Sequence, residues 1–326
     1  MRRRGALGWL TAALVLAAPA AAWADYGTVA SFGGPGRGVA RFGPPRNNFD
    51  FFRLGTSPGG IAFDGQGNVL VADTLGSQVE RFTPGGRSLG AFGRRGVAAG
   101  LLLNPTGVTV SGDRVYVAGN GNDRVDVYTA GGHWLGMFVV RSNVRRHAAM
   151  TRGAGPGQLE NPYGIAQGPD GLFYVADLNN SRVNRYDANG RPGGQLGRFG
   201  RGPGRFLAPF GVASDPAGAL WVSDRETNQL QKLSTDGSVL AVVGGTGSAP
   251  GEFISPEGIA VDRVGNVYVA DVLNRRIQKL RPDGGFVTAF GRGVLRQPTW
   301  VAVDAACRVY VADYRRVVVF ADPGGC

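Results

Sequence analysis

Few residues in this sequence are of a type that carries out chemistry. It contains two histidines, His133 and His147, and two cysteines, Cys307 and Cys326. A catalytic zinc site usually needs three protein ligands, and two histidines close together in the sequence do not supply them. A G-x-S-x-G nucleophile elbow and a phosphate-binding P-loop are both missing from the sequence. We therefore expect no catalytic residue, no metal site and no cofactor.

Acidic residues are more numerous, but their positions recur along the chain. Asp64, Asp215 and Asp262 each begin an Asp-x-x-Gly turn, which lacks the series of oxygen ligands found in a calcium loop. A second set of aspartates ends short Val-rich segments, and arginines recur a few residues later. Because these residues recur, we expect them to hold loops by hydrogen bonds, and a catalytic carboxylate is the alternative. The set comprises Asp73, Asp177, Asp224, Asp271 and Asp313, with Arg124, Arg182 and Arg276.

These carboxylates belong to a unit that occurs six times. Its clearest copy is SPEGIAVDRVGNVYVADVLNRRIQKL, residues 255–280. Short Val- and Ile-rich runs between Gly and Asp turns predict strands, and a repeat of about 47 residues with this pattern is typical of propeller blades. The units resemble NHL repeats in the pattern P-x-G-I-A-x-D, G-x-x-Y-V-A-D, N-x-R-V-x-x-F. This resemblance implies an all-β, six-bladed β-propeller of four-stranded antiparallel blades. The anchoring prolines are Pro58, Pro105, Pro162, Pro209, Pro256 and Pro298.

The two ends of the repeat region complement each other. The last unit ends after its third strand, near Phe320, whereas YGTVASFGG at residues 26–34 matches the fourth-strand pattern GGFVTAFGRG of the unit before it. We therefore expect residues 25–34 to close blade six, residues 35–56 to lead into blade one, and residues 57–326 to hold the repeats. Such a closure leaves no open inner edge in the ring.

The first 24 residues resemble a secretory leader. Three arginines precede an apolar stretch, and an Ala-Trp-Ala sequence that ends at Ala24 resembles a cleavage site. We expect a signal peptide over residues 1–24 and a secreted, extracytoplasmic protein, and an uncleaved N-terminal anchor is the alternative. No later segment of the sequence is long and apolar enough to span a membrane.

The two cysteines flank the second and third strands of the last unit. Because these strands are antiparallel, the start of one lies near the end of the other. In an oxidising compartment we expect a disulfide between Cys307 and Cys326, and two free thiols are the alternative.

Positive charge is the remaining signal of function. The formal charge is +11, of which three charges belong to the leader, and nearly all of the basic residues are arginines. This balance favours an acidic partner, although solubility and a bias in residue usage are an alternative. For an exported chain we expect a protein, an anionic polymer or an anionic lipid head group rather than nucleic acid. We expect a monomer.

Positions that vary between the repeats are the candidates for recognition. We expect the residues that follow the anchoring prolines to surround a central funnel, beside the loops that join second and third strands. An arginine-rich insertion between units two and three would add a flap, and Arg275 and Arg315 lie on the same side. Packing between blades is the alternative for the aromatic residues, and a solvated loop is the alternative for the flap. The predicted ligand-binding residues are Thr106, Tyr163, Phe210, Glu257, Trp300, Arg141, Arg145, Arg146 and Arg225.

The sequence therefore predicts a secreted, non-catalytic scaffold that binds a protein or an anionic ligand on its loop-rich face. A propeller enzyme, either a lyase or a lactonase-like hydrolase with a metal in the funnel, is the alternative that the resemblance leaves open.

Overall fold

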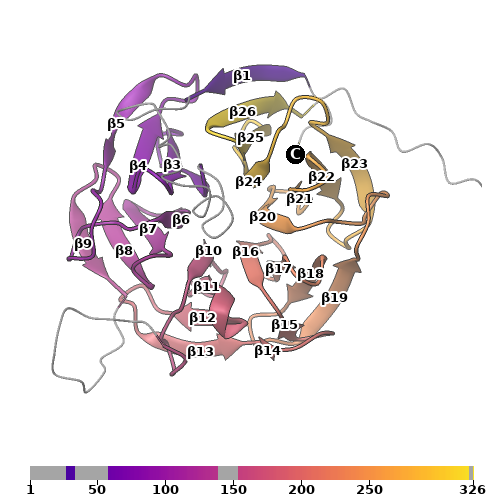
Figure 1. The fold of residues 1–326 in the computed structure, drawn as a ribbon, viewed down its shortest axis with the longest axis horizontal. Helices are drawn as coiled ribbons and strands as arrows, with labels where there is room; N and C mark the ends of the chain where they lie inside the picture. Colours follow the sequence, from indigo (N-terminus) through magenta and orange to yellow (C-terminus); the bar gives the residue numbers. More distant parts are fainter. Residues whose placement is uncertain (1–26, 34–57, 139–152, 323–325) are drawn as a thin grey trace, which may run out of the picture.

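The six repeats form six four-stranded antiparallel sheets in a ring, and the N-terminal strand supplies the fourth strand of the sixth sheet (Figure 1). The structure is a computed structural model that describes residues 27–33, 58–138, 153–322 and 326. The prediction of an all-β, six-bladed propeller is therefore confirmed. Within the described part of the chain, no helix is long and apolar enough to cross a membrane.

The strands follow the repeats in order, with the innermost strand first in each blade. Blade one consists of β2 (Ile61–Phe63), β3 (Val69–Asp73), β4 (Gln78–Phe82) and β5 (Ser88–Phe92). Blade two consists of β6 (Pro105–Ser111), β7 (Arg114–Gly119), β8 (Arg124–Thr129) and β9 (Trp134–Met137). Blade three consists of β10 (Pro162–Gln167), β11 (Phe173–Asp177), β12 (Arg182–Tyr186) and β13 (Pro192–Leu196).

The second half of the ring has the same plan. Blade four consists of β16 (Pro209–Ser214), β17 (Leu220–Asp224), β18 (Gln229–Leu233) and β19 (Val239–Gly244). Blade five consists of β20 (Pro256–Val261), β21 (Val267–Asp271), β22 (Arg276–Leu280) and β23 (Phe286–Phe290). Blade six consists of β24 (Pro298–Val303), β25 (Arg308–Asp313), β26 (Arg316–Ala321) and β1 (Thr28–Phe32). Two short parallel strands, β14 (Arg198–Phe199) and β15 (Arg205–Phe206), and the 3-10 turn η1 (Leu178–Asn180) complete the elements.

The ring closes through its N-terminal strand, as the sequence predicted. Strand β1 pairs with β26 in antiparallel register, so that Thr28 lies opposite Phe320 and Phe32 opposite Val317. The ring of Phe32 packs 4.7 Å from that of Phe82 in blade one, centroid to centroid. The closing strand therefore completes blade six and also contributes to the packing between blade six and blade one.

The core lies between the blades rather than within them. Side chains alternate along each second strand, so that one blade has two buried faces. In β21, Val267 and Val269 pack against blade four, whereas Tyr268 and Ala270 pack against blade six. The same arrangement at every junction joins the six blades by apolar burial.

Asp177 and Asp271 have the structural role predicted for the recurring aspartates, whereas Arg124 of blade two pairs with Asp126 of its own strand at 2.7 Å. Asp271 accepts hydrogen bonds from Arg276 Nε at 2.7 Å and from the backbone amide of Ile254 at 2.9 Å. Asp177 makes the same two kinds of bond in blade three, one of them with Arg182 Nε at 2.9 Å. These buried carboxylates tie the end of a second strand to the third strand and to the loop that enters the same blade.

The disulfide predicted between Cys307 and Cys326 is present, with 5.4 Å between the two Cα atoms. Cys307 takes the position that Gly265 has in the corresponding turn of blade five, and both residues have a positive φ, 62° and 92°. The bridge ties the end of the chain to this turn of blade six. Arg263 of blade five donates a hydrogen bond to the Cys326 carbonyl at 2.7 Å.

The strand directions define two faces of the ring. The innermost strands begin at one face, which also holds the loops between second and third strands and the loops that lead into each blade. We call it the loop-rich face. The innermost strands end at the opposite face, which holds the tight turns between first and second and between third and fourth strands. We call it the turn face.

Candidate functional site: the central channel and the loop-rich face

Five of the predicted recognition residues lie together around the central channel at the loop-rich face. Each comes from an innermost strand, and each is almost fully buried, with exposed fractions of 3–6%. They therefore fill the mouth of the channel instead of lining an open funnel. These residues are Thr106, Tyr163, Phe210, Glu257 and Trp300.

Trp300 does not occupy the position that the sequence indicated. Pro298 pairs with Asp313 and Val301 with Val311, just as Pro256 pairs with Asp271 and Ile259 with Val269 in blade five. Thr299 is therefore the equivalent of Glu257. Its Oγ1 donates a hydrogen bond to the Pro58 carbonyl at 2.8 Å, as Thr106 Oγ1 does to the Pro162 carbonyl at 2.9 Å. Trp300 takes the place of the glycine that follows in the other blades.

That glycine is required by the close approach of neighbouring innermost strands. A Cβ atom on Gly164 would lie 2.6 Å from the Phe210 carbonyl oxygen, and one on Gly258 would lie 2.6 Å from Trp300 Cα. Blades one to five thus meet around the channel through backbone atoms. Blade six instead places an indole ring there, beside blade one.

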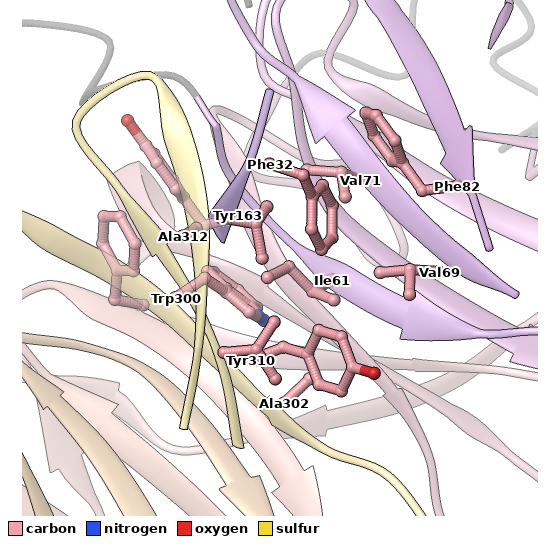
Figure 2. Close-up of a cluster of buried hydrophobic side chains, with 13 residues drawn as sticks. Phe32, Ile61, Val69, Val71, Phe82, Tyr163, Trp300, Ala302, Tyr310 and Ala312 are labelled. Atoms are coloured by element: carbon pink, nitrogen blue, oxygen red, sulfur yellow. The ribbon is translucent and has the colours of Figure 1, made fainter. Parts of the chain in front are cut away.

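Three aromatic rings, those of Tyr163, Phe210 and Trp300, pack together at the loop-rich end of the channel. Together with Thr106 and Glu257 they form the group that we call the plug. The centroids of Tyr163 and Phe210 are 4.1 Å apart, and those of Phe210 and Trp300 are 6.4 Å apart. Figure 2 shows Tyr163 and Trp300 within the cluster that also holds Phe32, Ile61 and other side chains at the junction of blades six and one. The rings come from β10, β16 and β24, so the plug joins three separate blades through its own packing.

Glu257 is the one carboxylate in this plug. Its side chain is 4% exposed, and Oε1 lies 3.5 Å from Arg225 Nη1. Among the described residues no group donates a hydrogen bond to Oε2. Burial raises the pKa of Glu257 to about 7, while the guanidinium of Arg225 opposes that rise. Burial, and then the charge of Glu257, raise the pKa of Tyr163.

Arg225 links the plug to the surface. Its side chain is 37% exposed, its Nε donates to Ser255 Oγ at 2.9 Å, and its guanidinium carbon lies 5.9 Å from the centroid of Phe210. The structure therefore brings Arg225 together with Glu257 and Phe210, as the predicted site required.

The open part of the channel faces the other way. A cavity of about 390 Å³ is lined by the residues near the ends of the innermost strands, and Trp300 is the plug residue that borders it. Among the described residues its lining carries no charged side chain, and it includes Thr109, Gln167 and Ser214 among aliphatic residues. The cavity therefore lies toward the turn face, and the buried rings of Tyr163, Phe210 and Trp300 lie toward the loop-rich end.

Charge is distributed unequally between the two faces. On the turn face, exposed acidic and basic side chains are mixed, as in the pair Arg281 and Asp283, 3.5 Å apart. On the loop-rich face, Glu226 is the one acidic residue that is classed as exposed among those described. The exposed arginines described on this face are Arg94, Arg95, Arg198, Arg201, Arg205, Arg275, Arg292 and Arg296.

Some of the other candidate residues are described by the structure, and others are not. The flap arginines Arg141, Arg145 and Arg146 lie outside the described residues, as does His147. His133 is exposed in a turn before β9, at the outer rim of blade two. Within the described ranges, no group of three or more His, Cys, Asp or Glu side chains could hold a metal ion.

Two features of the site were missed from the sequence. Ser223 replaces the alanine of the V-A-D pattern and donates to the Glu257 carbonyl at 2.6 Å, while it accepts from the Gly211 amide at 2.8 Å. The departure from the repeat was its signal. The exposed arginines Arg292 and Arg296 were also missed, because they lie in a loop between repeats.

Comparison with known proteins identifies the fold of this chain but does not identify an activity. No family model matches the chain. A segment of the chain is 27% identical to Protein brain tumor of Drosophila melanogaster over 138 residues, which cover 41% of this chain and 12% of that protein. The match therefore spans a small part of the relative's length.

Solved structures with a similar fold are mostly enzymes. Catalytically inactive H270A virginiamycin B lyase from Staphylococcus aureus, crystallised with quinupristin, aligns with a TM-score of 0.56 at 17% identity, over 80% of this chain and 79% of that one. The gluconolactonase XC5397 from Xanthomonas campestris aligns with a TM-score of 0.61 at 16% identity, over 82% and 86%. The PQQ-bound aldose sugar dehydrogenase of Streptomyces coelicolor aligns with a TM-score of 0.55 at 16% identity, over 82% and 94%. At such identities the likeness establishes the six-bladed propeller fold alone.

Proposed function

We propose that this chain is an exported, NHL-type propeller that binds an anionic ligand or an acidic protein surface on its loop-rich face without catalysing a reaction. The observation that carries the proposal is the unequal distribution of charge, with exposed arginines gathered on one face and mixed charges on the other. Guanidinium groups favour carboxylate, sulfate and phosphate partners, with which they form paired hydrogen bonds.

Other observations support parts of this proposal. The six repeats and the partial match to Protein brain tumor support the NHL type. The disulfide and the leader-like N-terminus support a location outside the cytoplasm. The aromatic plug supports a binding surface that is spread over the loops rather than sunk into the channel.

The experiment is retention of the purified chain on immobilised dextran sulfate, a polymer of known negative charge. We expect elution at a salt concentration well above that of a triple Arg198→Gln, Arg201→Gln, Arg205→Gln variant, because these exposed arginines lie around β14 and β15 on the loop-rich face. Replacement of Arg145 and Arg146 by alanine should also lower retention, if the flap belongs to the same surface. The matched control is an Arg87→Gln, Arg114→Gln, Arg191→Gln variant, which removes three exposed arginines from the turn face. Equal elution of the wild type and the triple variant would refute the proposal.

A propeller enzyme is the second candidate, and Glu257 is the observation that favours it. A buried carboxyl with a pKa near neutrality inside a central channel has the properties of a general acid or base. Glu257 is almost fully buried and is not among the described residues that line the open cavity, so the binding function is favoured. Stoichiometric metal in the purified protein, or turnover of a lactone or of quinupristin that Glu257→Gln abolishes, would establish the enzyme instead.

A further inference from the structure

A second recess lies on the loop-rich face, away from the channel, between blades five and six. It has a volume of about 710 Å³, which is within the range of ligand pockets. Three chain segments form it: the loop between β21 and β22, the loop between β23 and β24, and the start of β26. Its lining residues are Asn274, Arg275, Arg292, Gly293, Val294, Leu295, Arg296 and Arg316.

Four guanidinium groups line this recess, and among the described residues no carboxylate does. Arg316 is paired with the buried Asp313 at 3.0 Å and donates to the Val294 carbonyl at 2.8 Å. The side chains of Arg275 and Arg296 make no hydrogen bond or ion pair to any described residue and are exposed. The described residues around the recess therefore do not neutralise all of its positive charge. Its guanidinium groups can donate hydrogen bonds to the oxygen atoms of an oxyanion.

The backbone at Arg275 has a conformation that is unusual for an arginine. The last residue of this loop has a positive φ in every blade, and the first four blades use Ser77, Asp123, Ser181 and Asn228, with φ of 51–61°. Blade five has Arg275 at φ 54°. Arginine has no side-chain acceptor to stabilise a left-handed backbone, and such a conformation is strained for a long side chain. Blade six likewise has an arginine at this position, Arg315 at φ 68°, so both blades that flank the recess depart from the Ser, Asp and Asn of the other four.

We infer that this recess, hereafter the arginine recess, is a binding site for a phosphate-type oxyanion that carries at least two negative charges. The inference rests on the proposed function and assigns one site on the loop-rich face to one ligand chemistry. Arg275 and Arg296 would contact the anion directly, and Arg316, already oriented by Asp313, would complete the positive field. The volume admits a molecule larger than inorganic phosphate, such as a diphosphate or a phosphorylated sugar.

The test is calorimetric titration of the full chain with inorganic pyrophosphate at 50 mM and 500 mM salt. We expect one site per chain, with an affinity that falls as salt rises. The decisive variant is Arg275→Asn, because it installs the residue type found at Asn228 in blade four, at φ 56°. It should weaken binding about tenfold, the loss typical of one charge-assisted contact, while the melting temperature stays equal or rises. Arg296→Gln should weaken binding similarly, and the double variant should bind too weakly to titrate.

The control is Arg191→Gln, which removes an exposed arginine from the turn face and should leave pyrophosphate affinity unchanged. The inference is overturned by no binding to the wild type at 50 mM salt, or by equal affinity in Arg275→Asn. Citrate at equal charge tests the phosphate assignment, and binding as tight as that of pyrophosphate would contradict it. If dextran sulfate retention persists while pyrophosphate fails to bind, this inference fails and the proposed function stands.

Discussion

Glu257 makes the stability of the propeller depend on pH in an unusual direction. Its pKa rises from 4.5 to about 7 because the folded chain buries it, and Arg225 compensates only in part. Below pH 4.5 the carboxyl is protonated in both states and contributes nothing. Between pH 4.5 and 7 the unfolded chain releases the proton while the folded chain keeps it. The free energy of unfolding should therefore fall as pH rises through this window, and the loss should be complete above pH 7.

The magnitude follows from the same two values. Each tenfold difference in proton affinity corresponds to about 1.4 kcal/mol, so ionisation of Glu257 costs the folded state about 3 kcal/mol above pH 7. Glu257→Gln removes the pH dependence that Glu257 contributes. Any change that the amide itself makes to the free energy of unfolding is the same at every pH. We expect the difference in unfolding free energy between variant and wild type to shift by about 2 to 3 kcal/mol in favour of the variant from pH 5 to pH 8.

Urea denaturation followed by tryptophan fluorescence at pH 5, 6, 7 and 8 measures this shift. The matched control is Glu226→Gln, an exposed glutamate on the same face, which should follow the wild type at every pH. Arg225→Gln should raise the pKa of Glu257 further, because it removes the charge that opposes the rise. Parallel curves for the wild type and Glu257→Gln would refute the reasoning and place Glu257 in contact with water.

Three further predictions concern the closure of the ring and its blades, and urea denaturation measures each. Replacement of Cys307 and Cys326 by serine should lower the free energy of unfolding by about 3 kcal/mol, and an unchanged midpoint would contradict this. Phe32→Ala should cost about 3 to 4 kcal/mol, because the ring is 8% exposed and packs between two blades; a loss below 1 kcal/mol would place β1 outside the core. Asp271→Asn should cost about 3 to 5 kcal/mol, since it leaves the Arg276 guanidinium buried without its partner, and tolerance of the change would argue for solvent at this pair.

The blades could be predicted from the sequence because each repeat has the same pattern of strand and turn residues. Val- and Ile-rich runs between Gly and Asp turns predicted strands such as β21, and the match of YGTVASFGG to a fourth strand predicted the pairing of β1 with β26. Both inferences rest on patterns within short runs of consecutive residues. Repetition also separated structural carboxylates such as Asp271 from candidates for function.

The site was harder to predict because it depends on contacts between blades. The sequence QPTWVAVD lacks the glycine of the repeat, and we matched Trp300 to the wrong position by one residue. Nothing local indicates that Tyr163, Phe210 and Trp300 meet and bury one another, since their strands belong to three repeats. The arginine recess was missed for the same reason, because its guanidinium groups come from three separate segments.

The two ends of the chain are secured in different ways, and this gives the ring a mechanical polarity. The C-terminus is fixed by a covalent bridge to a turn within blade six, so tension on that end is carried by the bond between Cys307 and Cys326. Strand β1 is held by its hydrogen bonds to β26 and by the packing of Phe32. A pull on the N-terminus should therefore peel β1 from the ring at a low force and expose the junction of blades six and one. The same force at the C-terminus should leave the propeller closed.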